Sequence, residues 1–176
     1  MPRPVGGVIH SGGNVVEEIR FVADSMLGKL AKWLRVLGYD IHYQSYYQSG
    51  VIDQLVKEGR RLLSRHKEIA CRYSDAVLLH GSHVGKQLNE MKEKGILTHD
   101  RSKWFSRCLL CNVLLKEVKT DEARENVPEY IFYQNMGEIR FCPSCGRYYW
   151  PGTHRKRMLG QLEKWGFILK TPKPTL

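Results

Sequence analysis

The chain has 176 residues, a formal net charge of +10 and 42% hydrophobic residues. This apolar content suffices for a folded core and excludes wholesale disorder. No stretch approaches the roughly 18 consecutive apolar residues of a membrane span, and residues 1–18 lack the apolar segment of a signal peptide. We therefore expect a cytoplasmic protein with no membrane association and a flexible N-terminal lead-in over residues 1–18. The sequence leaves open a homo-oligomer or a protein partner.

Residues 19–100 alternate between strand and helix patterns. Apolar residues at helical spacing predict a helix from Leu27 to Gly38, with Lys29, Lys32 and Arg35 off the core stripe. Further helices are expected over residues 51–59 and 85–95. Short apolar runs predict strands over residues 19–23, 39–43, 60–64 and 76–80. Strands that alternate with helices indicate an α/β domain, with a parallel sheet flanked by helices.

The pattern changes near Trp104, and we place a domain boundary at about residue 100. Short antiparallel strands are expected in PEYIFYQN (128–135) and EIRFC (138–142). A final helix is predicted from Thr153 to Trp165, with Met158, Leu162 and Trp165 forming its core stripe. Residues 101–166 thus form a second unit that ends in a helix, and residues 167–176 are expected to be a flexible tail.

Four of the five cysteines form two CxxC pairs. Cys108 and Cys111 make up CLLC, and Cys142 and Cys145 make up CPSC. Two such pairs in a reducing compartment predict a tetrahedral site for one structural Zn²⁺ per chain, with Asn112 and Gly146 suited to the turns that follow each pair. Redox cysteines and disulfides are the alternatives. Cys71 is expected to be a buried free thiol.

Asp24 stands where the first predicted strand ends and the first helix begins. One interpretation is structural, because an aspartate at a helix start caps free backbone N–H groups. The other is chemical, because ligands of open parallel sheets bind at the carboxyl ends of the strands. A carboxylate there, joined by other acids, would hold Mg²⁺ or Mn²⁺.

The basic residues gather in the second unit. Residues 1–100 hold 14 Lys and Arg against 11 Asp and Glu, a balance of +3, and residues 101–176 hold 14 against 7, a balance of +7. Such a distribution favours a polyanionic partner, and nucleic acid before a membrane. We expect Arg155, Lys156 and Arg157 in the first turn of the last helix to contact RNA phosphates, with Tyr148 available to stack on a base. A merely basic surface is the alternative, and Trp150 is expected to pack the second unit against the first.

Four segments, FVADSMLGKLAKWLRVLGYD, EGRRLLSRH, RCLLCN and CPSCGRYYWPGTHRKRM, resemble in this order the RNase domain at the C-terminus of the Mut-seven exonuclease. The resemblance covers about residues 19–160. It implies a PIN-like nuclease domain, here residues 19–100, followed by a four-cysteine zinc ribbon with a C-terminal helix, here residues 101–166. It also implies metal-dependent hydrolysis of RNA by acids gathered at strand ends.

The match is incomplete at the acids of this family. Asp24 falls on the first of them, but His66 stands where the family's Thr-Arg-Asp motif has its aspartate, and His83 lies near a later acid. We therefore expect an altered one-metal site for Mg²⁺ or Mn²⁺, in which His66 and either His83 or His80 join Asp24. Asp24 and His66 are the expected catalytic residues. The alternative is a catalytically degenerate module that binds RNA or a partner.

Overall fold

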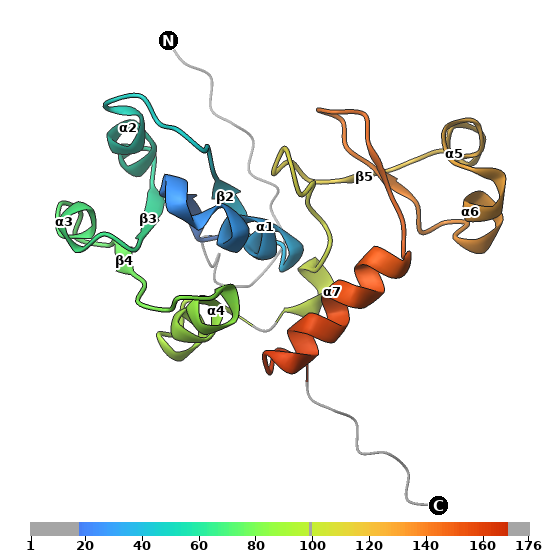
Figure 1. Ribbon diagram of the computed structural model, residues 1–176. Coiled ribbons are helices and arrows are strands. Elements are labelled where there is room, and N and C mark those ends of the chain that lie inside the picture. Colours follow the sequence, from blue (N-terminus) through green and yellow to red (C-terminus); the bar gives the residue numbers. More distant parts are fainter. Residues whose placement is uncertain (1–17, 99, 169–176) are drawn as a thin grey trace, which may run out of the picture.

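The computed structural model describes residues 18–98 and 100–168 of the chain. Most of the expected lead-in, residues 1–17, and most of the expected tail, residues 169–176, lie outside the described residues. The structure consists of a parallel sheet with its helices, a small antiparallel sheet next to the cysteine loops, and a final helix that contacts both parts (Figure 1).

A four-stranded parallel sheet confirms the predicted α/β fold. Its strands lie in the order β2-β1-β3-β4, and each neighbouring pair is parallel. The chain passes from β1 to β2 on one side of β1, and then from β2 to β3 on its other side. The carboxyl ends of β1 and β3 therefore flank the topological switch point, where such sheets bind ligands. The strands are β1 (Arg20–Ala23), β2 (Asp40–His42), β3 (Arg60–Ser64) and β4 (Val77–Leu78).

Helices cover this sheet and close a core with it. Phe21 and Leu63 of the strands pack with Leu30 and Leu34 of the first helix and Leu88 of the fourth, all completely buried. The helical elements are the 3₁₀ turn η1 (Ser25–Leu27), α1 (Gly28–Val36), α2 (Val51–Lys57), α3 (Lys67–Ala70), α4 (Val84–Glu93) and the 3₁₀ turn η2 (Arg101–Lys103). The short helix α3 had no signal in the sequence, whereas α1, α2 and α4 confirm predicted helices.

Two predictions for individual residues of this part are wrong. Arg35 is buried although helical spacing places it off the core stripe, because a cysteine loop covers that side of α1. Lys29 and Lys32 are exposed, as predicted. Cys71 is a free thiol but is exposed rather than buried, because it ends the four-residue helix α3 at the surface.

The second part, which we call the zinc ribbon (residues 104–152), contains a three-stranded antiparallel sheet. It consists of β5 (Lys116–Glu117), β6 (Arg140–Phe141) and β7 (Tyr148–Tyr149), in that order. The strand predicted over residues 128–135 is wrong, because this segment forms α6 (Glu129–Gln134), preceded by α5 (Thr120–Asn126). The adjacent residues Ile131 and Phe132 are both buried, which suits one side of a helix and not the alternation of a strand.

The last helix, α7 (Thr153–Lys164), confirms the predicted C-terminal helix. Met158 and Leu162 are buried in the core of the parallel-sheet part, and the ring of Trp165 lies edge-on to that of Trp33 at 4.7 Å. The end of the chain therefore packs on the first part of the structure, next to α1 and α4. Within the described ranges, no helix has the length and apolar character needed to cross a membrane.

Candidate functional site

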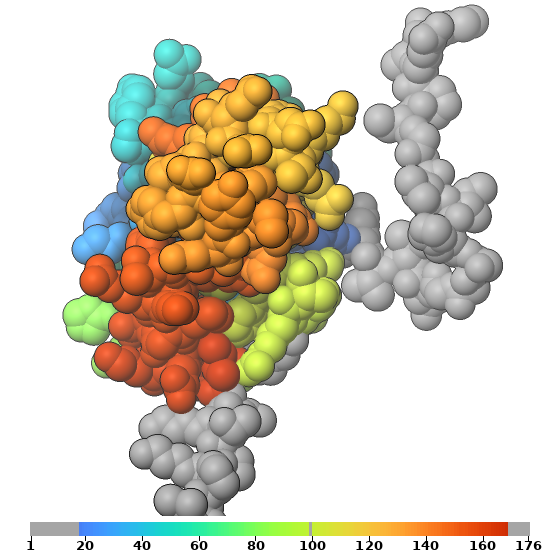
Figure 2. Space-filling model, turned by 90° about the vertical axis from the view of Figure 1, so that its right-hand side faces the viewer, coloured from blue at the N-terminus to red at the C-terminus, as the bar shows by residue number. Residues whose placement is uncertain are grey.

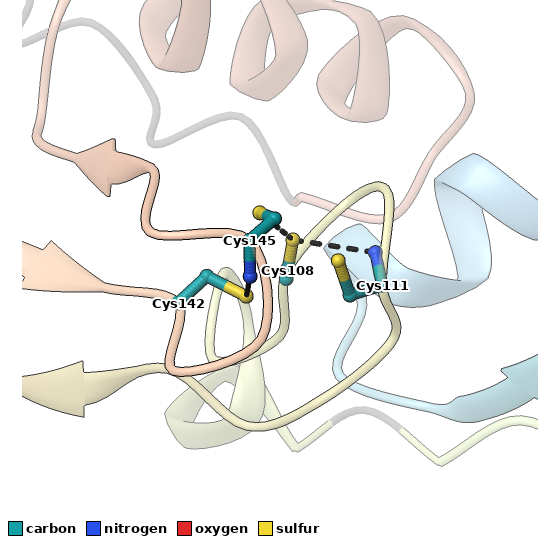
Figure 3. Close-up of side chains that lie close together, drawn as sticks. All are labelled: Cys108, Cys111, Cys142 and Cys145. Carbon is teal, nitrogen blue, oxygen red and sulfur yellow. Dashed lines mark hydrogen bonds between the residues drawn. The ribbon is translucent and has the colours of Figure 1, made fainter.

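Four cysteines from two loops come together (Figure 3). Cys108 and Cys111 lie on the loop after η2, and Cys142 and Cys145 lie on the loop between β6 and β7. Their Sγ atoms all lie within 4.8 Å of one another, and those of Cys108 and Cys145 are 3.8 Å apart. Among the residues that the structure describes, this is the only group of three or more His, Cys, Asp or Glu side chains that could hold a metal ion.

The two cysteine loops share one backbone geometry. In each loop the N–H of the second cysteine lies close to the Sγ of the first, at 3.3 Å and 3.4 Å. The next residue, Asn112 or Gly146, has a positive φ of 65° or 70°. Glycine and asparagine adopt this left-handed conformation at the lowest cost, which confirms the turns expected after both pairs.

This donor set fits a tetrahedral metal ion. A zinc ion with Zn–S bonds of about 2.3 Å requires thiolate sulfurs about 3.8 Å apart, which is the distance between Cys108 and Cys145. All four cysteines are free thiols rather than disulfides. Four protein ligands leave no open coordination position for a substrate, so a metal ion here has a structural role.

The surroundings of Cys108 favour its ionised form. Burial alone raises the pKa of this thiol, but the Tyr149 hydroxyl 3.1 Å from its Sγ and the N–H groups of Cys111 and Leu110 outweigh burial and lower the pKa to about 6. Burial raises the pKa of Cys142. A thiolate is the metal-binding form of cysteine, so a thiol ionised near neutral pH binds a metal ion readily.

Arg35 attaches the first cysteine loop to the parallel-sheet part. Its Nη1 donates to the carbonyl oxygens of Leu109 and Leu110, at 2.8 Å and 2.9 Å, and its Nη2 donates to the carbonyl oxygen of Ile41 at 3.1 Å. The two leucines lie between the cysteines of CLLC. The buried guanidinium therefore links this cysteine loop to both α1 and β2.

Asn112 and Arg107 make further bonds across the same contact. The Asn112 side chain accepts from the N–H of Ile41 at 3.0 Å and donates to the Asp40 carboxylate at 2.8 Å. Arg107 donates to the carbonyl oxygens of Gly38 at 2.8 Å and Asn112 at 2.9 Å. The cysteine loop is thus fixed to the edge strand β2 by side chains on both sides of the contact.

Asp24 lies at the switch point between β1 and β3, where its side chain is bonded to the protein itself. One carboxylate oxygen accepts from the N–H of Met26 at 2.9 Å, which confirms the helix cap. The other accepts from the Ser64 hydroxyl at 2.6 Å and the Arg65 N–H at 3.1 Å. Asp24 is only 4% exposed. Its carboxylate therefore ties the end of β1 to the end of β3.

The structure does not bring the predicted histidines into a metal site with Asp24. His66 follows β3, is exposed, and has its Nε2 2.9 Å from the sulfur of Met26. His83 is exposed at the start of α4. In the described part of the chain, no hydrogen bond or ion pair joins Asp24 to His66 or His83, and the three do not form a group able to hold a metal ion.

The predicted basic turn lies at the start of α7. Lys156 and Arg157 are exposed, and the Arg155 guanidinium lies 4.8 Å from the ring centre of Phe105. Within residues 18–98 and 100–168, none of these three cations forms an ion pair. Gly152 occupies the capping position of this helix, which begins at Thr153.

The aromatic residues beside this turn belong mainly to the zinc ribbon. Tyr148 and Trp150 are half-buried against its small core, and the Tyr148 hydroxyl donates to Glu122 at 3.3 Å. Trp150 therefore packs within the zinc ribbon rather than against the core of the parallel sheet, which differs from the prediction. Arg35, Arg107 and Asn112 make bonds between the two parts instead. For the two arginines the sequence carried no signal beyond their positive charge.

A family model described as "Mut7-C RNAse domain" matches residues 19–162, which is most of the chain. The match begins at the residue before β1 and ends within α7, so it includes both the parallel sheet and all four clustered cysteines. No curated protein and no solved structure matches the chain.

Proposed function

Because the chain belongs to the Mut7-C RNAse domain family, we propose that it acts on RNA as a zinc-stabilised module that binds the RNA backbone at the start of α7. The observation that carries this proposal is the run Arg155, Lys156 and Arg157. These are three successive cations in one helical turn, without an acidic partner in the part of the chain that the structure describes.

The position of these cations calls for an anionic partner. The start of a helix carries a partial positive charge, which disfavours further cations there. The phosphate groups of a polynucleotide would offset both the partial charge of the helix end and the charge of the three cations. Binding would also release counterions from the polynucleotide, which favours association. These three cations are part of a segment, residues 101–176, with a balance of +7. RNA is the polyanion that fits the family description.

The four clustered cysteines are proposed to hold one structural Zn²⁺. The small core of the zinc ribbon contains only five buried apolar residues in the described structure, which is little to stabilise the segment by itself. Metal binding supplies folding free energy to such small segments. The role of the zinc ion is to keep the loop that carries β7 and the start of α7 in place.

The burial and hydrogen bonding of Asp24 favour a protein that binds RNA without hydrolysing it. Its carboxylate is buried and accepts three hydrogen bonds from the protein. Phosphodiester hydrolysis with two metal ions requires several carboxylates to offset the charge of the metals and to orient water. His66 stands where the resemblance expects one of these acids, so the negative charge at this edge of the sheet is reduced.

Metal-dependent hydrolysis of RNA is the second candidate, favoured by the family description and by the place of Asp24 at the switch point. In this case Asp24, with His66 and His83, would hold Mg²⁺ or Mn²⁺. Imidazole ligands would shift the preference toward Mn²⁺. Asp24 would then have to exchange its bonds with Ser64 and Arg65 for the metal ion.

Fluorescence anisotropy with a labelled single-stranded RNA tests the binding proposal. The double variant Arg155→Ala/Arg157→Ala should weaken binding and lower the salt-dependence slope by about 1.4, since each phosphate contact on a single strand contributes about 0.7. Lys57→Ala/Lys67→Ala removes the same charge from α2 and α3, on the other side of the molecule (Figure 1). Equal effects of both pairs would contradict the proposed binding surface.

Incubation of the same RNA with Mg²⁺ or Mn²⁺ separates the two candidates. We expect intact RNA with the native chain and with Asp24→Asn. Cleavage by the native chain that is lost in Asp24→Asn, while RNA affinity is retained, would establish the hydrolysis candidate instead. Gel analysis of the RNA after incubation provides the measurement.

A further inference from the structure

A pocket of about 290 Å³ lies between the zinc ribbon and the start of α7. Figure 2 shows the face of the molecule where these two parts meet, with the zinc ribbon above α7. Four aromatic rings contribute to its walls, and the side chains of His154 and Arg155 of α7 lie beside them. The residues that matter here are Phe105, Tyr148, Tyr149, Trp150, His154 and Arg155.

The rings of this pocket are held in place by other contacts. The Tyr149 hydroxyl is within hydrogen-bond distance of the Cys108 Sγ, and the Tyr148 hydroxyl donates to the Glu122 carboxylate. Trp150 packs on the core of the zinc ribbon. Phe105 has a positive φ of 59° and lies under the guanidinium of Arg155. The aromatic walls are therefore largely preformed, which limits the entropy lost when a flat ligand enters.

The charged side chains that line the pocket are the arginines Arg107, Arg140 and Arg155 and the acid Glu138, so positive charge is in excess. In the described structure the side chains of His154 and Arg155 form no hydrogen bond or ion pair, and the Arg155 guanidinium lies over the ring of Phe105. Arg140 keeps a position beside the pocket by donating to the carbonyl oxygens of Gly137 and Ile139. A ligand that suits these walls has a flat aromatic portion and a negative group.

A nucleotide combines these two properties. The volume lies at the lower end of the range for small-molecule sites, so it suits a single base rather than a run of bases. Stacking of a base on an aromatic side chain strengthens binding whatever the base, because every base has a flat π-face. A base in a duplex is stacked and paired, and is not available for such a pocket.

We propose that this pocket takes one unpaired nucleotide of a single-stranded RNA, with its base among the aromatic rings and its phosphate beside His154 and Arg155. The inference rests on the proposed function and names the form of RNA that the protein selects. On this proposal the protein selects RNA that has an unpaired base, and does not bind every polyanion equally.

The experiment compares a labelled single-stranded RNA with the same strand in a duplex, using the full zinc-loaded chain. The single strand should bind at least about tenfold more tightly, which corresponds to about 1.4 kcal/mol of stacking. Arg155→Ala should reduce this preference, because Arg155 lines the pocket. Arg157→Ala removes the same charge from the same turn outside the pocket, and should weaken both forms equally.

A second measurement does not depend on any variant of α7. In NMR titrations with AMP, the indole signal of Trp150, assigned through Trp150→Phe, should shift, and ribose 5-phosphate should shift it less. Equal binding of single-stranded and duplex RNA, or an unmoved Trp150 signal with RNA bound, would overturn the pocket inference and leave the proposed function standing. Absence of RNA binding, with or without a response to AMP, would overturn the proposed function itself.

Discussion

Replacing Arg35 with methionine tests how firmly the zinc ribbon is attached to the parallel sheet. The change removes three hydrogen bonds to the carbonyl oxygens of Leu109, Leu110 and Ile41. At about 1–1.5 kcal/mol for each bond, the loss amounts to about 3–5 kcal/mol. Burial opposes the charge of Arg35 and lowers its pKa, so removal of the cation relieves part of this loss. We expect the free energy of unfolding to fall by about 3 kcal/mol.

Urea titration of the zinc-loaded protein, followed by circular dichroism, measures this change. Lys32→Met is the matched control, because Lys32 lies exposed on the same helix without a bonded partner in the described structure, and should cost less than about 0.5 kcal/mol. Arg35→Lys should recover little, since an ammonium group cannot donate in the fixed directions of a guanidinium. A loss below about 1 kcal/mol for Arg35→Met, or one equal to that of Lys32→Met, would refute the reasoning.

Three further predictions concern stability. Asp24→Ala should lower the free energy of unfolding by about 2–4 kcal/mol, because the helix cap and the bonds from Ser64 and Arg65 are lost together. A loss below about 1 kcal/mol in a denaturant titration would contradict this structural role of the carboxylate. Removal of zinc by a strong chelator should unfold residues 104–152 in NMR spectra, and a retained fold would contradict structural zinc. Asp40→Asn should cost about 1–2 kcal/mol at pH 7. Burial alone would raise the pKa of Asp40, but bonds from Arg60 and Asn112 outweigh it and hold the pKa below the ordinary 3.8. The contribution of the carboxylate is therefore present above that pH and lost in stronger acid, where urea titrations of the native chain and the variant should converge.

The parallel sheet and the cysteine site could be predicted from the sequence because both have local signatures. Short apolar runs located all four strands of the sheet, and helical spacing located α1, α2, α4 and α7. The CxxC spacing fixed the two loops, and Asn112 and Gly146 marked the turns that follow them. Each of these signals depends only on residues close together in the chain.

Features that depend on distant contacts were missed. Arg35 is buried because a loop more than 70 residues away covers it, and helical spacing cannot show which surface meets that loop. Segment 128–135 has a strand-like composition, yet the small core of the zinc ribbon buries the adjacent pair Ile131 and Phe132 and favours a helix. The sequence placed Asp24 correctly at a strand end but could not show that Ser64 and Arg65 would occupy its carboxylate.

The packing of α7 has a consequence for the order of folding. Residues of α7 complete the core formed with α1 and α4, so the zinc ribbon is an insertion within one folding unit rather than a module appended to it. During synthesis, about sixty residues separate the end of α4 from the start of α7. A nascent chain that ends before Thr153 leaves the apolar surfaces beneath Met158 and Leu162 open to solvent and to aggregation. Metal binding by the four cysteines during synthesis would reduce the time for which these apolar surfaces stay exposed. It would hold the residues just before α7 close to the parallel sheet, so that α7 can pack as soon as it is made.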